Sequence, residues 1–165
     1  QTVACLRYLG KKAGLNGAGE AEAARVDQIL CEAQDLRNGG VGFFYSPAAA
    51  EAGERARKME GLAPSYEKFE TWLAQQGTVY TVGATPTAGD FHLWEMLDQY
   101  EMCAADGGLP SPLDGFPKLK NLHATLRAEP KLAKYFASDL YRLPPNNKFA
   151  GWGGGEPADW AKRFG

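Results

Sequence analysis

The chain has 165 residues, of which 44% are hydrophobic and 23% charged, and its formal net charge at pH 7 is −2. This length fits one domain of ordinary size. The net charge is close to zero, whereas a nucleic-acid-binding protein usually carries an excess of positive charge. No apolar run reaches the roughly 18–20 residues of a membrane-spanning helix. We therefore expect neither a nucleic acid nor a membrane as a partner.

The cysteine and histidine content argues against metal or disulfide chemistry. Cys5, Cys31 and Cys103 are odd in number and widely spaced, so they form neither a disulfide framework nor a C-x-x-C pair. His92 and His123 have no acidic or cysteine cluster beside them in the sequence. We expect no metal, no His-dependent nucleophile, and a reducing, cytoplasmic compartment.

The sequence opens inside a helical pattern. Val3, Leu6 and Leu9 recur at helical spacing, and the glycines at 14 and 17 end the pattern. Because this helix begins at Gln1 without an initiator methionine, we expect the chain to be a fragment of a longer protein.

A second helix is predicted over residues 20–37, and the Asn-Gly-Gly run at 38–40 predicts its end. Its apolar stripe consists of Val26, Ile29, Leu30, Ala33 and Leu36. Ser46 and Pro47 then read as the N-cap and first residue of another helix. Gly61 and Pro64 interrupt that helix, and either a kink or two collinear helices fits the pattern.

A capping box begins the next helix, because Thr87 and Asp90 can satisfy amides of the first turn that lack intrahelical acceptors. Two short helices are predicted near residues 116–128 and 130–138, and the stretch from residue 143 is predicted to be irregular. The aromatic residues expected in the core are Tyr66, Phe69, Trp72, Phe91 and Trp94. With no alternating strand and no internal repeat, the sequence predicts an all-α bundle.

The order of these segments resembles the helical half of a cytosolic glutathione S-transferase, most of all the mu class, from Gln1 to about Gly153. The matching motifs are Gln-Thr followed by VACLRYL at 3–9, RVDQILCEAQD at 25–35, FYSP at 44–47, TAGDFHLWEMLDQ at 87–99, FPKLK at 116–120 and PPNNKFAGWG at 144–153. The resemblance implies a helical bundle of the family's C-terminal domain type, preceded by the last helix of a thioredoxin-like domain.

The implied division is residues 1–13 for that last helix, 14–153 for the helical domain and 154–165 for an extension that the mu pattern does not include. In the family, the catalytic tyrosine belongs to the thioredoxin-like domain, so the resemblance assigns no catalytic residue to this chain. We expect the 165 residues alone to be inactive and poorly soluble, because the face that packs on that domain would be exposed.

Three residues match the family's glutathione site. A helix that opens at Gln1 and Thr2 offers free amides, a positive dipole end and a hydroxyl to the γ-glutamyl carboxylate. Asp35 matches a mu-class carboxylate that reaches the glutathione ammonium across the dimer. Taken alone, Thr2 reads as an N-cap and Asp35 as a solvated face residue, and only the resemblance favours the binding role.

Four residues match the pocket for the second substrate: Tyr45, Val41, Gln34 and Asn147. The Tyr45 hydroxyl could donate to the developing charge of an electrophile. Core packing of the aromatic run at 43–45 is the alternative.

The resemblance implies a homodimer. Arg7 matches an interface arginine near the two-fold axis, and Lys11 with Asp27 could form a cross-helix ion pair there. Thr87 and Asp90 are expected to be structural, with Asp90→Ala costing about 0.5–2 kcal/mol.

The function implied is transfer of the glutathione thiol to an apolar electrophile, with glutathione as co-substrate, as in detoxification. The alternatives are a non-catalytic scaffold subunit built on the same fold and a transferase-like domain fused to a larger assembly.

Overall fold

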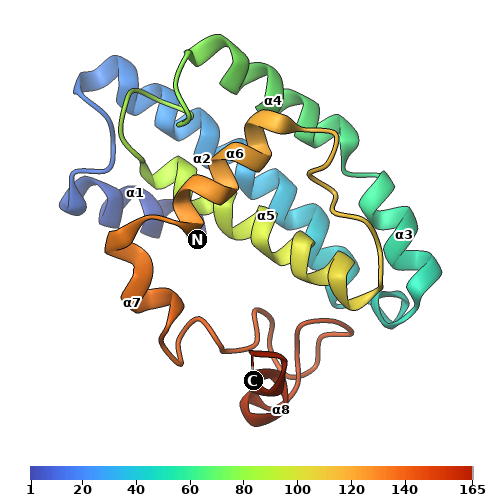
Figure 1. Ribbon diagram of the computed structural model, residues 1–165. Coiled ribbons are helices and arrows are strands. Elements are labelled where there is room, and N and C mark those ends of the chain that lie inside the picture. The colour runs from blue at the N-terminus through green and yellow to red at the C-terminus, as the bar shows by residue number, and fades with distance from the viewer. Residues whose placement is uncertain (165) are drawn as a thin grey trace.

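Helix α5 (Ala88–Asp106) runs through the middle of the computed structural model, which describes residues 1–164 (Figure 1). Leu93, Leu97 and Tyr100 on this helix are at most 1% exposed. The longest helix, α2 (Gly19–Phe44), packs along α5, and α6 (Pro117–Arg127) and α3 (Ala52–Glu60) also contact it. The described residues contain no strand, and the predicted all-α bundle is confirmed.

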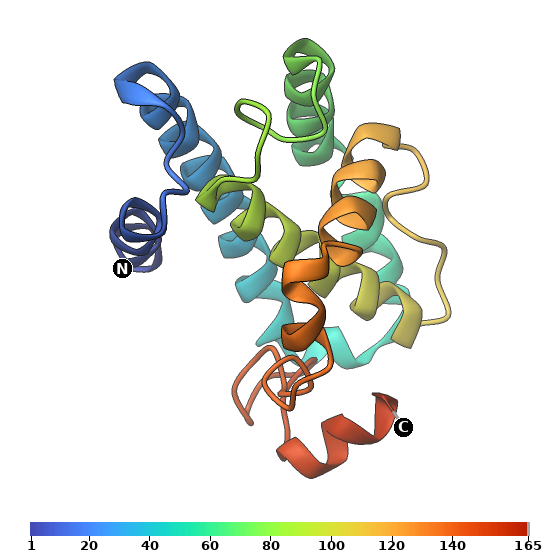
Figure 2. The ribbon, with the colours of Figure 1, turned by 60° about the vertical axis from the view of Figure 1, so that its left-hand side comes forward.

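The remaining helices surround this pair. Helix α1 (Thr2–Ala13) crosses α2 and the start of α5, α4 (Ala63–Gln76) lies against α6, and α7 (Ala133–Phe136) leads into an irregular stretch (Figures 1 and 2). A short helix, α8 (Pro157–Ala161), lies in the extension. Gly14 ends α1 in the left-handed conformation, with φ of 70°, which glycine adopts without steric cost. The division at residues 13 and 153 stays a prediction.

The predicted end of α2 at residues 38–40 is wrong, because the helix continues to Phe44. Gly40 is buried where α2 meets α5: a Cβ atom there would lie 2.8 Å from the Tyr100 hydroxyl oxygen. That hydroxyl donates to the Leu36 carbonyl at 3.2 Å. Gly40 therefore allows the two helices to pack closely, and it does not end α2 as its sequence context predicts.

Gly40→Ala is expected to lower the free energy of unfolding by about 1–3 kcal/mol, because the new methyl group would displace the Tyr100 hydroxyl from its bond to Leu36. Gly42→Ala is the matched control: the same helix offers open space around a Cβ atom at this position. There alanine should raise stability by about 0.5–1 kcal/mol through helix propensity. Urea unfolding of both variants measures the difference, and equal effects would contradict the packing account.

The predicted helix start at Ser46 and Pro47 is confirmed, since the Ser46 side chain accepts a hydrogen bond from the Ala48 amide at 3.2 Å. The element that Ser46 caps is a 3-10 helix, Pro47–Ala50, and the extended Glu51 separates it from α3. The predicted helix is therefore divided here, and α3 and α4 follow as two separate helices. Of the two arrangements left open for the Gly61 region, the chain adopts two helices.

The capping box at the start of α5 is also confirmed. Asp90 is fully buried and accepts hydrogen bonds from the Thr87 amide, the Thr87 hydroxyl and the Thr81 amide, each at 2.7 Å. One carboxylate thus joins the start of α5 to the loop that precedes it. Of the predicted core aromatics, Tyr66, Phe69 and Trp94 are buried, whereas Trp72 and Phe91 are partly buried against the core.

Candidate functional site

The start of α1 presents its first amides to solvent. Gln1 occupies the N-cap position without a side-chain capping bond, and both Gln1 and Thr2 are exposed. The first backbone bond of the helix runs from the Cys5 amide to the Gln1 carbonyl at 3.2 Å, so the amides of residues 2–4 have no intrahelical acceptor. This end of the chain can receive an anion, and it lies outside the hollows described below.

Asp35 lies on α2 with its side chain exposed. Within residues 1–164 it makes no hydrogen bond or ion pair, whereas Glu32, one turn earlier, pairs with Lys68 at 2.6 Å. The carboxylate of Asp35 is therefore free to meet a group from outside the chain. Within residues 1–164, no hydrogen bond joins Asp35 to Gln1 or Thr2.

Tyr45 and Asn147, which are 102 positions apart, meet at the end of α2. The Asn147 amide donates a hydrogen bond to the Tyr45 hydroxyl oxygen at 3.1 Å. Phe44 is buried, but Tyr45 is 40% exposed, so core packing accounts for only part of the aromatic run. Because the Tyr45 oxygen accepts this bond, its own proton stays available for donation to another molecule.

Val41 lies one helical turn before Tyr45 and lines a small hollow of about 40 Å³ with Pro145 and Asn146. Gln34 lies two turns earlier on α2, where its amide nitrogen donates to Asn38 at 2.8 Å and its carboxamide oxygen is buried without a partner in residues 1–164. The same face of α2 thus carries Gln34, Val41 and Tyr45.

Four polar residues in this hollow were not predicted as site residues: Arg37, Glu95, Gln99 and Asn146. Arg37 precedes Val41 by four residues, and this helical spacing was a signal that could have identified it. Glu95 and Gln99 lie on α5, and no sequence pattern indicated that this part of α5 would face the end of α2.

The loop that carries Asn147 is held against the core by Trp152. Its amide donates to the Phe44 carbonyl at 3.1 Å, and its indole nitrogen donates to Asp106 at 2.9 Å. Arg163, in the extension, makes two further hydrogen bonds to Asp106 at 2.6 and 2.7 Å. The extension is therefore docked on the end of α5 through the same carboxylate that fixes Trp152.

The predicted ion pair between Lys11 and Asp27 is not the one that forms. Asp27 pairs with Arg7, with 2.8 Å between Nε and Oδ1, and the Arg7 guanidinium also contacts the Cys31 sulfur at 3.8 Å. Arg7 lies one helical turn before Lys11 and takes the carboxylate. Roles for Arg7, Lys11 and Asp27 in a dimer stay predictions.

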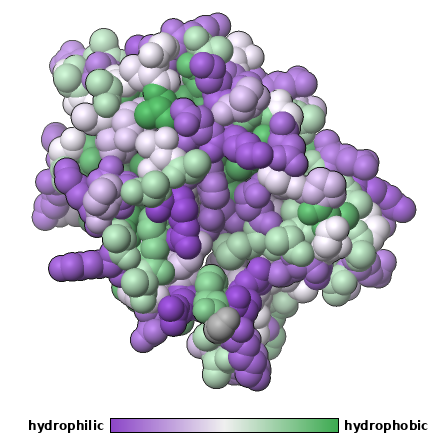
Figure 3. Space-filling model, viewed as in Figure 1, coloured by the Kyte–Doolittle hydropathy of each residue, from purple (hydrophilic) through white to green (hydrophobic). Residues whose placement is uncertain are grey.

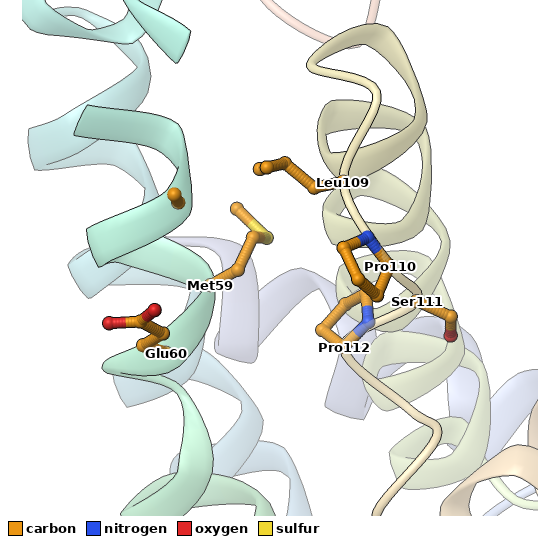
Figure 4. A pocket seen from close by; sticks show the side chains of 7 residues that line it. Met59, Glu60, Leu109, Pro110, Ser111 and Pro112 are labelled. Carbon is orange, nitrogen blue, oxygen red and sulfur yellow. The ribbon is translucent and has the colours of Figure 1, made fainter. Parts of the chain in front are cut away.

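A separate hollow of about 260 Å³ lies between α3 and the loop after α5 (Figure 4). Met59 faces Leu109, Pro110 and Pro112 across it, and Glu60 lies at its side. None of its lining residues was expected in the site, and none also lines the hollow beside Val41.

Exposed apolar side chains are spread over several elements. In the view of Figure 3, hydrophobic residues lie scattered among hydrophilic ones instead of forming one continuous surface. The large exposed hydrophobic residues are Tyr8, Leu9, Tyr45, Tyr135, Leu140, Leu143 and Phe149. Five of these seven lie at Tyr45 or between residues 135 and 149.

The three cysteines are free thiols, and Cys103 is buried on α5. Burial raises the pKa of Cys103 to about 11, which keeps it protonated and unreactive at neutral pH. Within residues 1–164, no group of three or more His, Cys, Asp and Glu side chains is placed to hold a metal ion. In the same part of the chain, no helix is both long and apolar enough to cross a bilayer.

The family model of the glutathione S-transferase C-terminal domain matches residues 34–139, and the all-helical arrangement agrees with it. The chain belongs to the glutathione S-transferase family. It is 31% identical to the class-mu 26 kDa isozyme 51 of Fasciola hepatica over 159 residues, which cover 96% of this chain and 69% of the relative. It is 34% identical to glutathione S-transferase P of Bos taurus, covering 89% and 67%.

A solved structure shows the same fold. The Pi-class glutathione S-transferase of Onchocerca volvulus superposes with a TM-score of 0.76 at 28% identity, covering 91% of this chain and 70% of that one. The chain thus spans about two thirds of the length of these relatives. The matched region 34–139 includes Asp35, Val41 and Tyr45 and leaves out Gln1, Thr2 and Asn147.

Proposed function

We propose that this chain is part of a mu-like glutathione transferase that joins the glutathione thiol to an apolar electrophile. The reaction forms a bond from the thiolate sulfur to the electrophilic carbon as the leaving group departs, or as an activated double bond takes up a proton. Family membership supports transferase chemistry, and the motifs from Gln1 to Gly153 favour the mu class.

The observation that carries the proposal is the hydrogen bond from the Asn147 amide to the Tyr45 hydroxyl at the exposed end of α2. It polarises the hydroxyl of a residue one helical turn after the apolar Val41 and leaves the hydroxyl proton free to stabilise charge that develops on the electrophile. The two residues come from distant segments, as expected of a pocket wall.

Glutathione itself would be held by the start of α1. The free amides after Gln1, with the Thr2 hydroxyl, suit the γ-glutamyl carboxylate. Asp35, which has no partner in residues 1–164, suits the glutathione ammonium of a neighbouring subunit in a homodimer. Arg7 would then lie at the subunit interface, and the protein would work in the cytoplasm.

In this proposal, the hydroxyl that stabilises the thiolate comes from a thioredoxin-like domain, so the 165 residues alone are inactive. The test expresses the complete gene product and the 165-residue chain and measures retention on immobilised glutathione and turnover of chlorodinitrobenzene. We expect retention and turnover for the complete product and no turnover for the chain alone. Retention without turnover would favour a scaffold subunit, and an active chain alone would contradict the assignment of the thiolate site.

A further inference from the structure

A polar network centred on the buried Asp98 joins α5 and α6 to the segment after α7. Asp98 on α5 is only 8% exposed. One carboxylate oxygen lies 3.0 Å from Nε2 of His123 on α6, and the other accepts a hydrogen bond from the Tyr141 hydroxyl at 2.9 Å. Both oxygens of a buried carboxylate are therefore bonded to side chains of two further segments, which offsets the cost of its burial.

The two partners of Asp98 are fixed from their other sides as well. The His123 ring stacks on Trp94, with ring centroids 5.5 Å apart and planes at 7°, and the Trp94 indole nitrogen donates to the His123 carbonyl at 3.1 Å. The Arg127 guanidinium lies 4.6 Å from the Tyr141 ring centre. The network thus anchors Tyr141 at a defined place on the helical core.

Tyr141 is six residues before Asn147, and Pro144 and Pro145 lie between them. Two consecutive prolines restrict the backbone, so they transmit the position of Tyr141 to the residues that follow. Beyond them the Asn146 amide bonds the Gly153 carbonyl at 2.9 Å, which closes the loop on itself. The loop that carries Asn147 is thus anchored at two places, by Trp152 after Asn147 and by Tyr141 before it.

We infer that Asp98 is a positioning residue for the electrophile pocket. One of its carboxylate oxygens is fixed by His123, and the other holds Tyr141. Tyr141 in turn helps to position the loop in which the Asn147 amide bonds to Tyr45. The part that concerns a substrate rests on the proposed function, whereas the part that concerns the loop does not. Asp98 acts through Tyr141 and touches none of the reacting atoms.

The first test is amide hydrogen exchange in the 165-residue chain. Tyr141→Phe keeps the ring and removes the bond to Asp98, so exchange over residues 143–150 should become about tenfold faster while the middle of α5 stays unchanged. Tyr135→Phe is the matched control, because this tyrosine belongs to the same aromatic cluster and its hydroxyl makes no hydrogen bond within residues 1–164. Equal exchange in the two variants would overturn the inference.

Substitutions of Asp98 itself provide a rescue comparison. Asp98→Asn keeps an acceptor for the Tyr141 hydroxyl and should exchange much like the unsubstituted chain, whereas Asp98→Leu should loosen the loop at least as much as Tyr141→Phe. If Asp98→Leu does not fold, the pair Tyr141→Phe and Tyr135→Phe still decides the question. If Asp98→Asn speeds amide exchange in the loop as much as Tyr141→Phe does, the proposal that Asp98 holds the loop by accepting the Tyr141 hydrogen bond is contradicted.

Kinetics then link the loop to the pocket. In the complete gene product, Tyr141→Phe should raise KM for chlorodinitrobenzene about threefold to tenfold and leave KM for glutathione unchanged. A loosened loop with unaltered KM for the electrophile would overturn the role in the pocket. A product with no conjugating activity would instead contradict the proposed function, and the exchange result would still decide whether Asp98 holds the loop.

Discussion

Asp90→Ala is expected to lower the free energy of unfolding by about 3–5 kcal/mol, more than the loss of an ordinary capping residue. Asp90 is fully buried, and its removal would leave the Thr81 amide, the Thr87 amide and the Thr87 hydroxyl without an acceptor. Urea or thermal unfolding measures the loss. The exposed Asp139 is the control, since Asp139→Ala should change stability by less than about 0.5 kcal/mol.

Ionisation of Asp90 should contribute measurably to the pH dependence of the free energy of unfolding. Burial raises the pKa of its carboxyl group, and the hydrogen bonds from Thr81 and Thr87 oppose that rise. Because the folded chain holds this proton more tightly than the unfolded chain, ionisation of Asp90 lowers stability as pH rises through the interval above about 4. Asp90→Asn should remove this contribution, and an unchanged pH profile in that variant would contradict the assignment.

Asp35→Asn is expected to raise KM for glutathione in the complete gene product by about tenfold or more, which corresponds to roughly 1.5–3 kcal/mol for a bond between charged groups. Its stability should change by less than about 0.5 kcal/mol, because the side chain is exposed. Steady-state kinetics with varied glutathione measure the effect.

The matched control for this substitution is Asp139→Asn, which removes the same charge from another exposed position. It should leave KM for glutathione unchanged. If the two variants behave alike, Asp35 has no specific contact with glutathione, and its side chain is only part of the solvated face of α2.

Local patterns predicted the elements whose signals lie close together in the sequence. The capping box at Thr87 and Asp90 is confirmed because its partners are three residues apart. The end of α2 was misjudged because the burial of Gly40 depends on Tyr100, which is 60 positions away. The sequence alone does not distinguish a glycine that ends a helix from one that allows close packing against another helix.

The candidate site divides in the same way. The family resemblance, and not helical spacing, singled out Gln34, Val41 and Tyr45; they share one face of α2 because the helix continues to Phe44. No spacing rule relates Tyr45 to Asn147, whose contact depends on the path of an irregular loop. The competition between Arg7 and Lys11 for Asp27 is likewise decided by how α1 crosses α2.

The proposal that glutathione binds at the start of α1 and at Asp35 can be tested most directly by titration. Glutathione is added to the isotope-labelled complete gene product, and the amide chemical shifts are recorded. We expect the largest shifts at residues 2–4 and at Asp35, and weaker binding of glutathione to the Asp35→Asn variant. Shifts that gather around Met59 and Leu109, or that leave residues 2–4 and Asp35 unaltered at saturation, would contradict the proposal.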